Sequence, residues 1–231
     1  MLILGIETAT EQVGVAIGGH EGVLASAHSA KGRRHAENLT PAIEFICGQA
    51  EIELGEIGLV AVDIGPGLFT GLRVGVAAAK AIAFALRVPM IGVSSLDLLA
   101  FPVRFTSRMI VAAVDARRGE LYHAFYRQVP GGVQRVSGPG LGNPDDLAAE
   151  LLAASTEVLL VGDGARRYHE VFEGLARVEH AEVGNSFPSA SSLVQLAHPR
   201  ALREEFGPPE SIEPLYLRRP DAEINWTTRN G

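Results

Sequence analysis

Hydrophobic and polar positions alternate along the N-terminal segment of the chain, a pattern typical of half-buried β-strands. The alternation predicts strands over Leu2–Glu7, Val13–Gly18 and Gly22–Ser29, with the polar turn 8–12 joining the first two. Because the connections are short, the three strands are expected to pair as an antiparallel meander at the start of a sheet.

A helical period replaces the alternation after this meander. Apolar residues recur three or four positions apart over 35–50, and Pro41 within that stretch predicts either a kink or a helix that begins there. The remaining elements of the first half alternate between strand and helix: a buried strand over 58–64, an Ala-rich helix from Thr70 to Leu86, a strand over 90–93, and a helix to Ala100 capped by Ser94 or Ser95.

The second half repeats this theme, with Pro102 predicted to mark the boundary between two lobes. Its predicted elements are a hairpin of strands 109–115 and 120–127, a Gly/Pro-rich loop over 130–142, a helix that begins at Pro144, a strand over 158–161 and a helix over about 191–205. The segment from Pro208 onward is rich in proline and charge and is expected to be irregular. We therefore predict an α/β protein of two lobes, each a mixed sheet flanked by helices: residues 1–102, completed by the helix at 191–205, and a smaller lobe over 103–231.

Composition narrows the functional classes. Apolar residues make up 47% of the 231 residues and aromatic residues only 6%, which suits buried strands and closely packed helices. Cys47 is the single cysteine, so intrachain disulfides and Cys-clustered metal sites are excluded. The N-terminal segment has no basic flank, and no apolar run reaches the length of a membrane span, so we expect a cytoplasmic protein with no membrane partner. A net charge of −7 argues against RNA binding by this chain alone.

The segment from Asp63 to Gly75 carries the sharpest local signal. Gly65 and Gly67 allow a tight turn out of a buried strand, and Thr70 is placed to cap the helix that follows. The free N–H groups at such a helix start can hold an anion. A turn that holds no ligand explains the same residues equally well.

A ridge of small residues runs along the predicted helix 70–86. Gly71, Gly75, Ala79 and Ala83 lie four apart, beside Leu72, so another helix or a sheet can approach that face closely. We consider two occupants: the protein's own sheet, or a partner's helix. In the second case the apolar stripe of the preceding helix would supply the other half of the interface, with the residues His35, Leu39, Ile43 and Ile46.

Several motifs, kept in order and spacing, resemble the TsaB family, also called YeaZ. They span the chain and consist of Ile3–Thr8, Gly65–Gly75, Val114–Glu120 and Tyr216–Arg218. The resemblance implies the two-lobed fold of actin, Hsp70 and the sugar kinases. It also implies a role in transferring a threonylcarbamoyl group to the adenosine beside the anticodon, in tRNAs that read codons beginning with A. The implied partners are a catalytic paralogue, TsaD, and an ATPase, TsaE, with tRNA reached through the complex. The helix interface considered above would also allow the isolated chain to pair with itself.

Catalytic members of the wider family carry a His-x-x-x-His metal pair, and the matching positions here are Ser95 and Leu99. Leucine cannot ligate a metal, so we predict no metal site and no catalytic residue. Kinases of this fold place an Asp at the first phosphate loop, where this chain has Glu7. We therefore predict at most a vestigial site for ATP or ADP, weak or composite within the complex, and no required cofactor. Its candidate residues are Glu7, Thr8, Gly65, Gly67, Gly162, Asp163 and Gly164.

One charged cluster stands apart from these motifs, at the tip of the predicted hairpin: Asp115, Arg117, Arg118 and Glu120. Salt bridges within the turn are one explanation, and a surface for a partner or RNA is the other. The competing reading of the whole chain is an autonomous enzyme of the same fold, either a glycoprotease-like metallopeptidase or a small-molecule kinase or ATPase.

Overall fold

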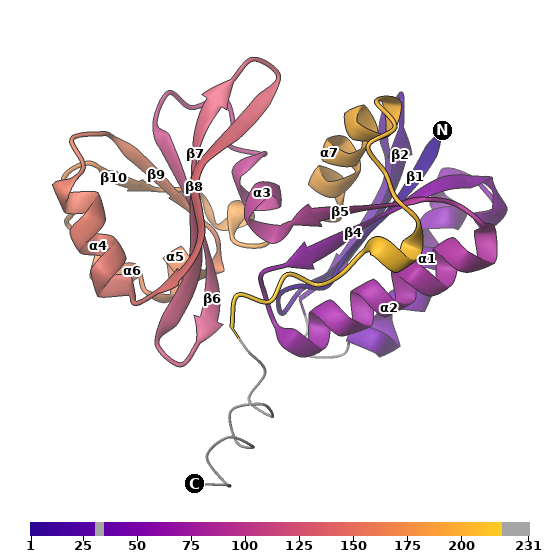
Figure 1. Ribbon diagram of the computed structural model, residues 1–231, viewed down its shortest axis with the longest axis horizontal. Helices are drawn as coiled ribbons and strands as arrows, with labels where there is room; N and C mark the ends of the chain where they lie inside the picture. The colour runs from indigo at the N-terminus through magenta and orange to yellow at the C-terminus, as the bar shows by residue number, and fades with distance from the viewer. Residues whose placement is uncertain (31–34, 219–231) are drawn as a thin grey trace, which may run out of the picture.

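Two lobes lie side by side in the computed structural model (Figure 1), which describes residues 1–30 and 35–218. The predicted loop over 31–34 and the end of the tail, 219–231, lie outside the described residues. The first lobe contains β1 (Leu2–Glu7), β2 (Val13–Gly19), β3 (Gly22–Ser29), α1 (His35–Ala50), the 3-10 turn Leu54–Glu56, β4 (Ile57–Gly65), α2 (Phe69–Leu86) and β5 (Met90–Ser94). The helix α3 (Ser95–Ala100) then leads across to the second lobe.

The second lobe repeats the topology of the first. Its elements are β6 (Met109–Arg117), β7 (Glu120–Val129), β8 (Gly132–Gly142), α4 (Pro144–Ala153), β9 (Val158–Val161), α5 (Asp163–Arg167), α6 (His169–Phe172) and β10 (Val178–His180). The first sheet has the order β3-β2-β1-β4-β5 and the second β10-β9-β6-β7-β8. Within each sheet the first three strands in chain order pair antiparallel and the last two join parallel, so one arrangement occurs twice. The predicted pair of mixed sheets is confirmed.

Helices cover both faces of each sheet. In the first lobe, alternate residues of β1 point to opposite sides: Leu4 packs under α1 and α2, and Ile3 packs under α7 (Ala190–Leu202). In the second lobe, α3 covers one face of the sheet, while α4, α5 and α6 cover the other. By length and composition α2 passes the test for a membrane span, as core helices often do, but here one side of it is packed on the first sheet.

The chain returns to the first lobe at its end. The helix α7 is followed by a 3-10 turn, Pro209–Ser211. An extended segment then runs along the first lobe towards the second (Figure 1). The N–H of Leu215 donates to the carbonyl of Ile64 at 2.7 Å, and Ile212 packs against the first core. Another 3-10 turn, Val183–Asn185, precedes α7. Residues from both ends of the chain therefore build the first lobe.

Two details differ from the sequence prediction, in β8 and in the start of α2. The Gly/Pro-rich segment 130–142 is not a loop but contains β8, an edge strand that tolerates Pro139 because one side of it has no strand partner. The predicted helix over 35–50 is confirmed as α1, and of its two alternatives the start at Pro41 is excluded, because Pro41 lies inside the helix. The helix α2 begins after Leu68 without a side-chain cap, so the predicted Thr70 cap is wrong. The Ser94 cap of α3 is confirmed, since its side chain accepts from the N–H of Leu96.

Candidate functional site

The predicted partner ridge on α2 faces the protein's own sheet. All of the small residues on it are buried, and a Cβ atom added at Gly75 would lie less than 3.0 Å from Oγ1 of Thr8. A Cβ atom added at Gly71 would meet the carbonyl of Thr8 equally closely. The Thr8 hydroxyl in turn donates to the carbonyl of Gly71 at 2.8 Å. The ridge is small because the end of β1 approaches it, so the prediction of a partner's helix on this face is wrong.

The matching stripe on α1 is buried as well, which corrects the other half of the predicted interface. The apolar residues of the α1 stripe and those predicted beside them on α2 all lie inside the first lobe: Leu39, Ile43 and Ile46 of α1, and Leu72, Ala79 and Ala83 of α2. His35 is also buried, not a surface residue, and its Nε2 is 2.8 Å from the carbonyl of Thr10. It ties the start of α1 to the turn between β1 and β2.

The opposite sides of the same two helices are exposed, and they carry large apolar side chains beside polar residues such as Glu44 of α1. Phe45 of α1 is 57% exposed and Phe84 of α2 is 52% exposed. Ala81 and Ala77 lie one and two turns before Phe84, respectively, on the exposed side of α2. The two helices run next to each other along the outer side of the first lobe (Figure 1). Exposed large apolar side chains gathered on one face are typical of a binding surface.

The turn from β4 into α2 is packed against its own lobe. Gly65 has a φ of +101°, which only glycine adopts without strain. A Cβ atom at Gly67 would be less than 3.0 Å from the carbonyl of Ala9, and the N–H of Leu68 donates to that same carbonyl at 2.7 Å. Because the backbone of the β1–β2 turn fills the concave side of this turn, the turn does not fit a phosphate group.

Two carboxyl groups are buried where β1 and β4 end. Glu7 accepts the N–H of Ala9 at 2.8 Å, and Asp63 accepts the hydroxyl of Ser95 at 2.7 Å and the N–H of Gly65 at 2.8 Å. Each keeps a second oxygen that is buried with no hydrogen-bond partner among the described residues. Burial raises the pKa of Glu7 well above its usual value, and the charge of Asp63 raises it further. Burial likewise raises the pKa of Asp63 to about 7.

The second predicted glycine loop lies at the end of β9. Gly162 has a φ of +110° and, like Gly164, packs directly against the backbone of β6. Asp163 accepts the N–H of Asp115 at 3.1 Å, and burial raises its pKa to about 6. These glycines are therefore explained by the close approach of α5 to the sheet, and nucleotide binding by this loop stays a prediction.

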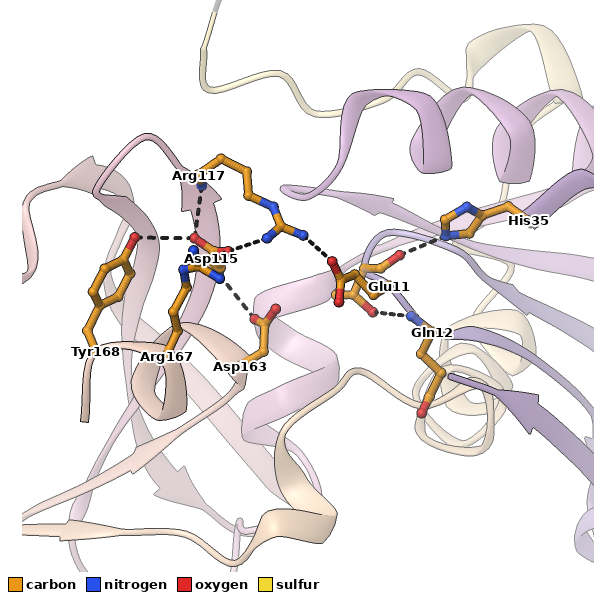
Figure 2. A network of polar contacts seen from close by, with 9 residues as sticks. Glu11, Gln12, His35, Asp115, Arg117, Asp163, Arg167 and Tyr168 are labelled. Carbon is orange, nitrogen blue, oxygen red and sulfur yellow. Dashed lines mark hydrogen bonds and ion pairs between the residues drawn. The ribbon is translucent and has the colours of Figure 1, made fainter. Parts of the chain in front are cut away.

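A network of polar contacts crosses between the lobes at this level (Figure 2). Arg117 donates to Asp115 of its own lobe at 3.0 Å and to Glu11 of the first lobe at 2.5 Å. Arg167 at 3.4 Å and the hydroxyl of Tyr168 at 3.4 Å also contact Asp115. Next to this network, the side chain of Gln12 donates to the carbonyl of Pro188, just before α7, at 3.3 Å. Of these residues, Glu11, Asp115, Arg117 and Arg167 line a cavity of about 340 Å³ between the lobes.

The charged cluster predicted at the hairpin tip is thus divided among three roles. Asp115 and Arg117 pair within the turn and across the lobes, whereas Glu120 forms an ion pair with Arg218 of the C-terminal segment. Arg118 is exposed. Sequence reasoning did not find Glu11, because nothing in a polar turn indicates a partner more than a hundred residues away.

The described residues contain no group of three or more His, Cys, Asp or Glu side chains placed to hold a metal ion. At the two positions that match the family's histidine pair, Ser95 donates its hydroxyl to Asp63 and Leu99 is buried in the core of the second lobe. Both side chains are committed to the protein's own structure.

Two mixed sheets of the same order, covered by helices and facing each other across a polar cleft, define a two-lobed protein of the actin and sugar-kinase class. A ROK hexokinase from Thermus thermophilus has this fold, with a TM-score of 0.52 over 88% of the chain and 12% identity. Residues 23–226 match the family model described as "TsaD: tRNA N6-adenosine threonylcarbamoyltransferase". The chain belongs to this family.

Its relatives include TsaB proteins that match along nearly their whole length. TsaB of Bacillus subtilis, a tRNA threonylcarbamoyladenosine biosynthesis protein, is 27% identical over 98% of both chains. The crystal structure of YeaZ from Pseudomonas aeruginosa has a TM-score of 0.81 and 26% identity, covering 94% of this chain and 99% of that one. An uncharacterised protein of Mycobacterium leprae is 38% identical, and the chain spans 56% of its length.

Proposed function

We propose that this chain is the non-catalytic scaffold or activator subunit of the complex that adds a threonylcarbamoyl group to tRNA. The target would be the adenosine next to the anticodon, in tRNAs reading codons that begin with A. The observation that carries the proposal is the match to TsaB along both full lengths. The burial of Ser95 and Leu99, where catalytic relatives have ligands, supports a non-catalytic role.

The partners in this proposal are a TsaD-like catalytic paralogue and a TsaE-like ATPase, with tRNA reached through the complex. The net charge of −7 supports an indirect contact with tRNA, because a chain that grips phosphates alone is usually basic. No cofactor is required by this chain. ATP or ADP belongs to a composite site formed with the partners, since the turn at Gly67 is filled by its own lobe. Such a complex would work in the cytoplasm.

We place the partner's docking surface on the exposed side of α1 and α2. Phe45 and Phe84 would be covered by the equivalent helices of the paralogue, and the alanines between them allow close helix approach. Two helices from each protein then form a four-helix arrangement. The isolated chain would self-pair through the same surface, because these aromatic rings are left exposed by residues 1–30 and 35–218.

Reconstitution tests the function. The full chain, its catalytic paralogue and the ATPase are mixed with an unmodified tRNA, ATP and threonylcarbamoyl adenylate, and the modified nucleoside is measured by mass spectrometry. We expect product only when this chain and both partners are present. Product formed by this chain alone, or undiminished product when it is left out, would refute the proposed role.

A pair of matched variants tests the docking surface. Ala81→Arg places a long cation on the exposed side of α2, and Ala149→Arg makes the same change on the exposed side of α4 in the other lobe. Both should fold, as judged by circular dichroism. Ala81→Arg should weaken binding of the catalytic paralogue by about a hundredfold or more in calorimetry, because it buries an unpaired charge. Equal affinity for the two variants would exclude this face.

A further inference from the structure

A second cavity lies at the lobe junction, between α7 of the first lobe and the β7–β8 hairpin of the second (Figure 1). Its volume of about 410 Å³ is in the range of pockets that hold small metabolites. Both lobes contribute to it, through Val93, Asp97, Tyr126, Val133, Arg135, Leu196 and Arg200. None of these residues belongs to the polar network of Figure 2 or to the exposed side of α1 and α2.

One guanidinium group is held rigidly at the wall of this cavity. Arg135 donates through Nη2 to Asp97 at 2.6 Å and through Nε to the hydroxyl of Tyr126 at 3.2 Å. The Tyr126 hydroxyl itself donates to Asp97 at 2.8 Å. Within the described part of the chain, Nη1 of Arg135 makes no hydrogen bond or ion pair, so it is oriented and still has donor capacity.

The second guanidinium group comes from the end of α7. Arg200 donates through Nη1 to the carbonyl of Gly92 at 2.9 Å, while its Nε lies 3.7 Å from Glu205. Glu205 is the closer partner of Arg203, which it contacts at 2.5 Å. The lining of the cavity therefore carries two cations against the single carboxylate of Asp97, an excess of positive charge in a chain whose net charge is −7.

The rest of the lining is aliphatic. Val93 lies on the first-lobe side, Val133 on the second, and Leu196 is one turn before Arg200 on α7. A bare inorganic anion would satisfy the arginines but leave these side chains against water. A carboxylate attached to an apolar body would satisfy both parts of the lining, because guanidinium groups bind carboxylates through paired hydrogen bonds.

We propose that this cavity is a binding site for a small organic monocarboxylate, held by Arg135 and Arg200 and contacting both lobes. A ligand there bridges the first and second lobes and so favours one inter-lobe arrangement over others. The site is independent of the proposed docking surface and of the role in tRNA modification.

NMR titration of the isotope-labelled full chain tests the site with three probes: benzoate, its neutral isostere benzamide, and inorganic phosphate. We expect benzoate to shift the amide signals of β8 and α7 with saturation. Benzamide and phosphate should each bind at least about tenfold more weakly than benzoate, because benzamide lacks the negative charge and phosphate lacks the apolar body. Equal binding of benzoate and benzamide, equal binding of benzoate and phosphate, or no binding of benzoate would each overturn the proposal.

Variants then locate the site. Arg200→Gln should weaken benzoate about tenfold, whereas Arg127→Gln, at an exposed arginine of β7 that does not line the cavity, should leave benzoate binding unchanged. Leu196→Phe keeps both guanidinium groups and fills part of the cavity, so it should also reduce binding. Amide spectra confirm that each variant is folded. Benzoate binding that is unaffected by both Arg200→Gln and Leu196→Phe would place the ligand elsewhere and refute the assignment.

Discussion

The contact between Thr8 and α2 makes the small residues of that helix a requirement of the monomer. We predict that Gly75→Ala destabilises the isolated protein, although alanine is the better helix former. A Cβ atom there would lie less than 3.0 Å from Oγ1 of Thr8, where ordinary contacts are 3.4–4 Å. Either α2 must move away from the end of β1, or the Thr8 side chain must turn and lose its hydrogen bond to Gly71.

The magnitude follows from three terms. Overpacking of a close contact costs about 1–3 kcal/mol. If the Thr8 side chain also turns away, loss of its buried hydrogen bond to Gly71 costs about 1–3 kcal/mol more. Better helix propensity returns about 1 kcal/mol. The net expectation is a loss of about 1–5 kcal/mol in the free energy of unfolding, which is a large share of the stability of an ordinary domain.

Gly48→Ala supplies the matched control. Gly48 lies in α1, next to α2, and an added Cβ would meet nothing within 4 Å. The same chemical change should therefore stabilise the protein there by about 0.5–1 kcal/mol. Urea unfolding followed by circular dichroism measures both variants. If Gly75→Ala and Gly48→Ala shift the midpoint in the same direction, the close approach of Thr8 to α2 is wrong.

A double-mutant cycle separates the Thr8 contact from a general effect on the helix. Thr8→Ala removes the hydroxyl that opposes the new Cβ atom. In the Thr8→Ala background, Gly75→Ala should cost at least about 1 kcal/mol less than in the wild type, because contacting residues couple. Strict additivity of the two changes would show that the cost arises elsewhere.

Two further predictions concern charged groups. Because burial raises the pKa of Asp63 to about 7 from an ordinary 3.8, the folded chain holds this proton more tightly than the unfolded chain, and stability falls as the pH rises from about 4 through 7. Asp63→Asn should therefore be more stable than wild type at pH 8, by about 4 kcal/mol at most, and the difference should vanish near pH 4. Urea titrations at both pH values measure this difference, and a difference that does not change with pH would contradict the prediction. At the lobe junction, Glu11→Gln should cost under about 1 kcal/mol because the pair is half exposed. Arg117→Gln should cost more, because among the described residues it leaves the buried Asp115 with one cation, Arg167, and the hydroxyl of Tyr168. Urea midpoints of the two variants check the order, and a larger loss for Glu11→Gln would reverse the argument.

Periodicity predicted most of the elements because the cores of both lobes are built from regular apolar spacing. The alternation over Leu2–Glu7 and the helical stripe of α1 appear in the structure at nearly the predicted positions. The strand β8 escaped prediction because Gly138 and Pro139 interrupt its alternation, and such residues are tolerated only where one edge is free. The short elements α6 and β10 have too few residues to show a period.

Inter-lobe contacts could not be predicted from local spacing. Arg117 and Glu11 are 106 positions apart, and each lies in a polar turn that is fully explained by local structure. Their meeting depends on how the two repeated lobes face each other, which is set by α3 and the packing around it. The proximity of Glu7 and Asp63 is consistent with their positions near the ends of two parallel strands, which gather side chains at one edge of a sheet. The burial that raises the pKa of both carboxyl groups could not be predicted from these positions.

The assignment of the partner surface failed for a reason specific to α2. Its buried stripe continues from Gly75 through Ala79 to Ala83, and its exposed side carries Ala77 and Ala81 at the same four-residue spacing. Both stripes are smooth, so spacing and side-chain size alone do not tell which one faces the sheet. What separates them is the end of β1, which leaves no room for a Cβ atom at Gly75, whereas Ala81 is exposed. A small residue on a helix therefore indicates a close neighbour, and only the tertiary structure decides whether that neighbour belongs to the same chain.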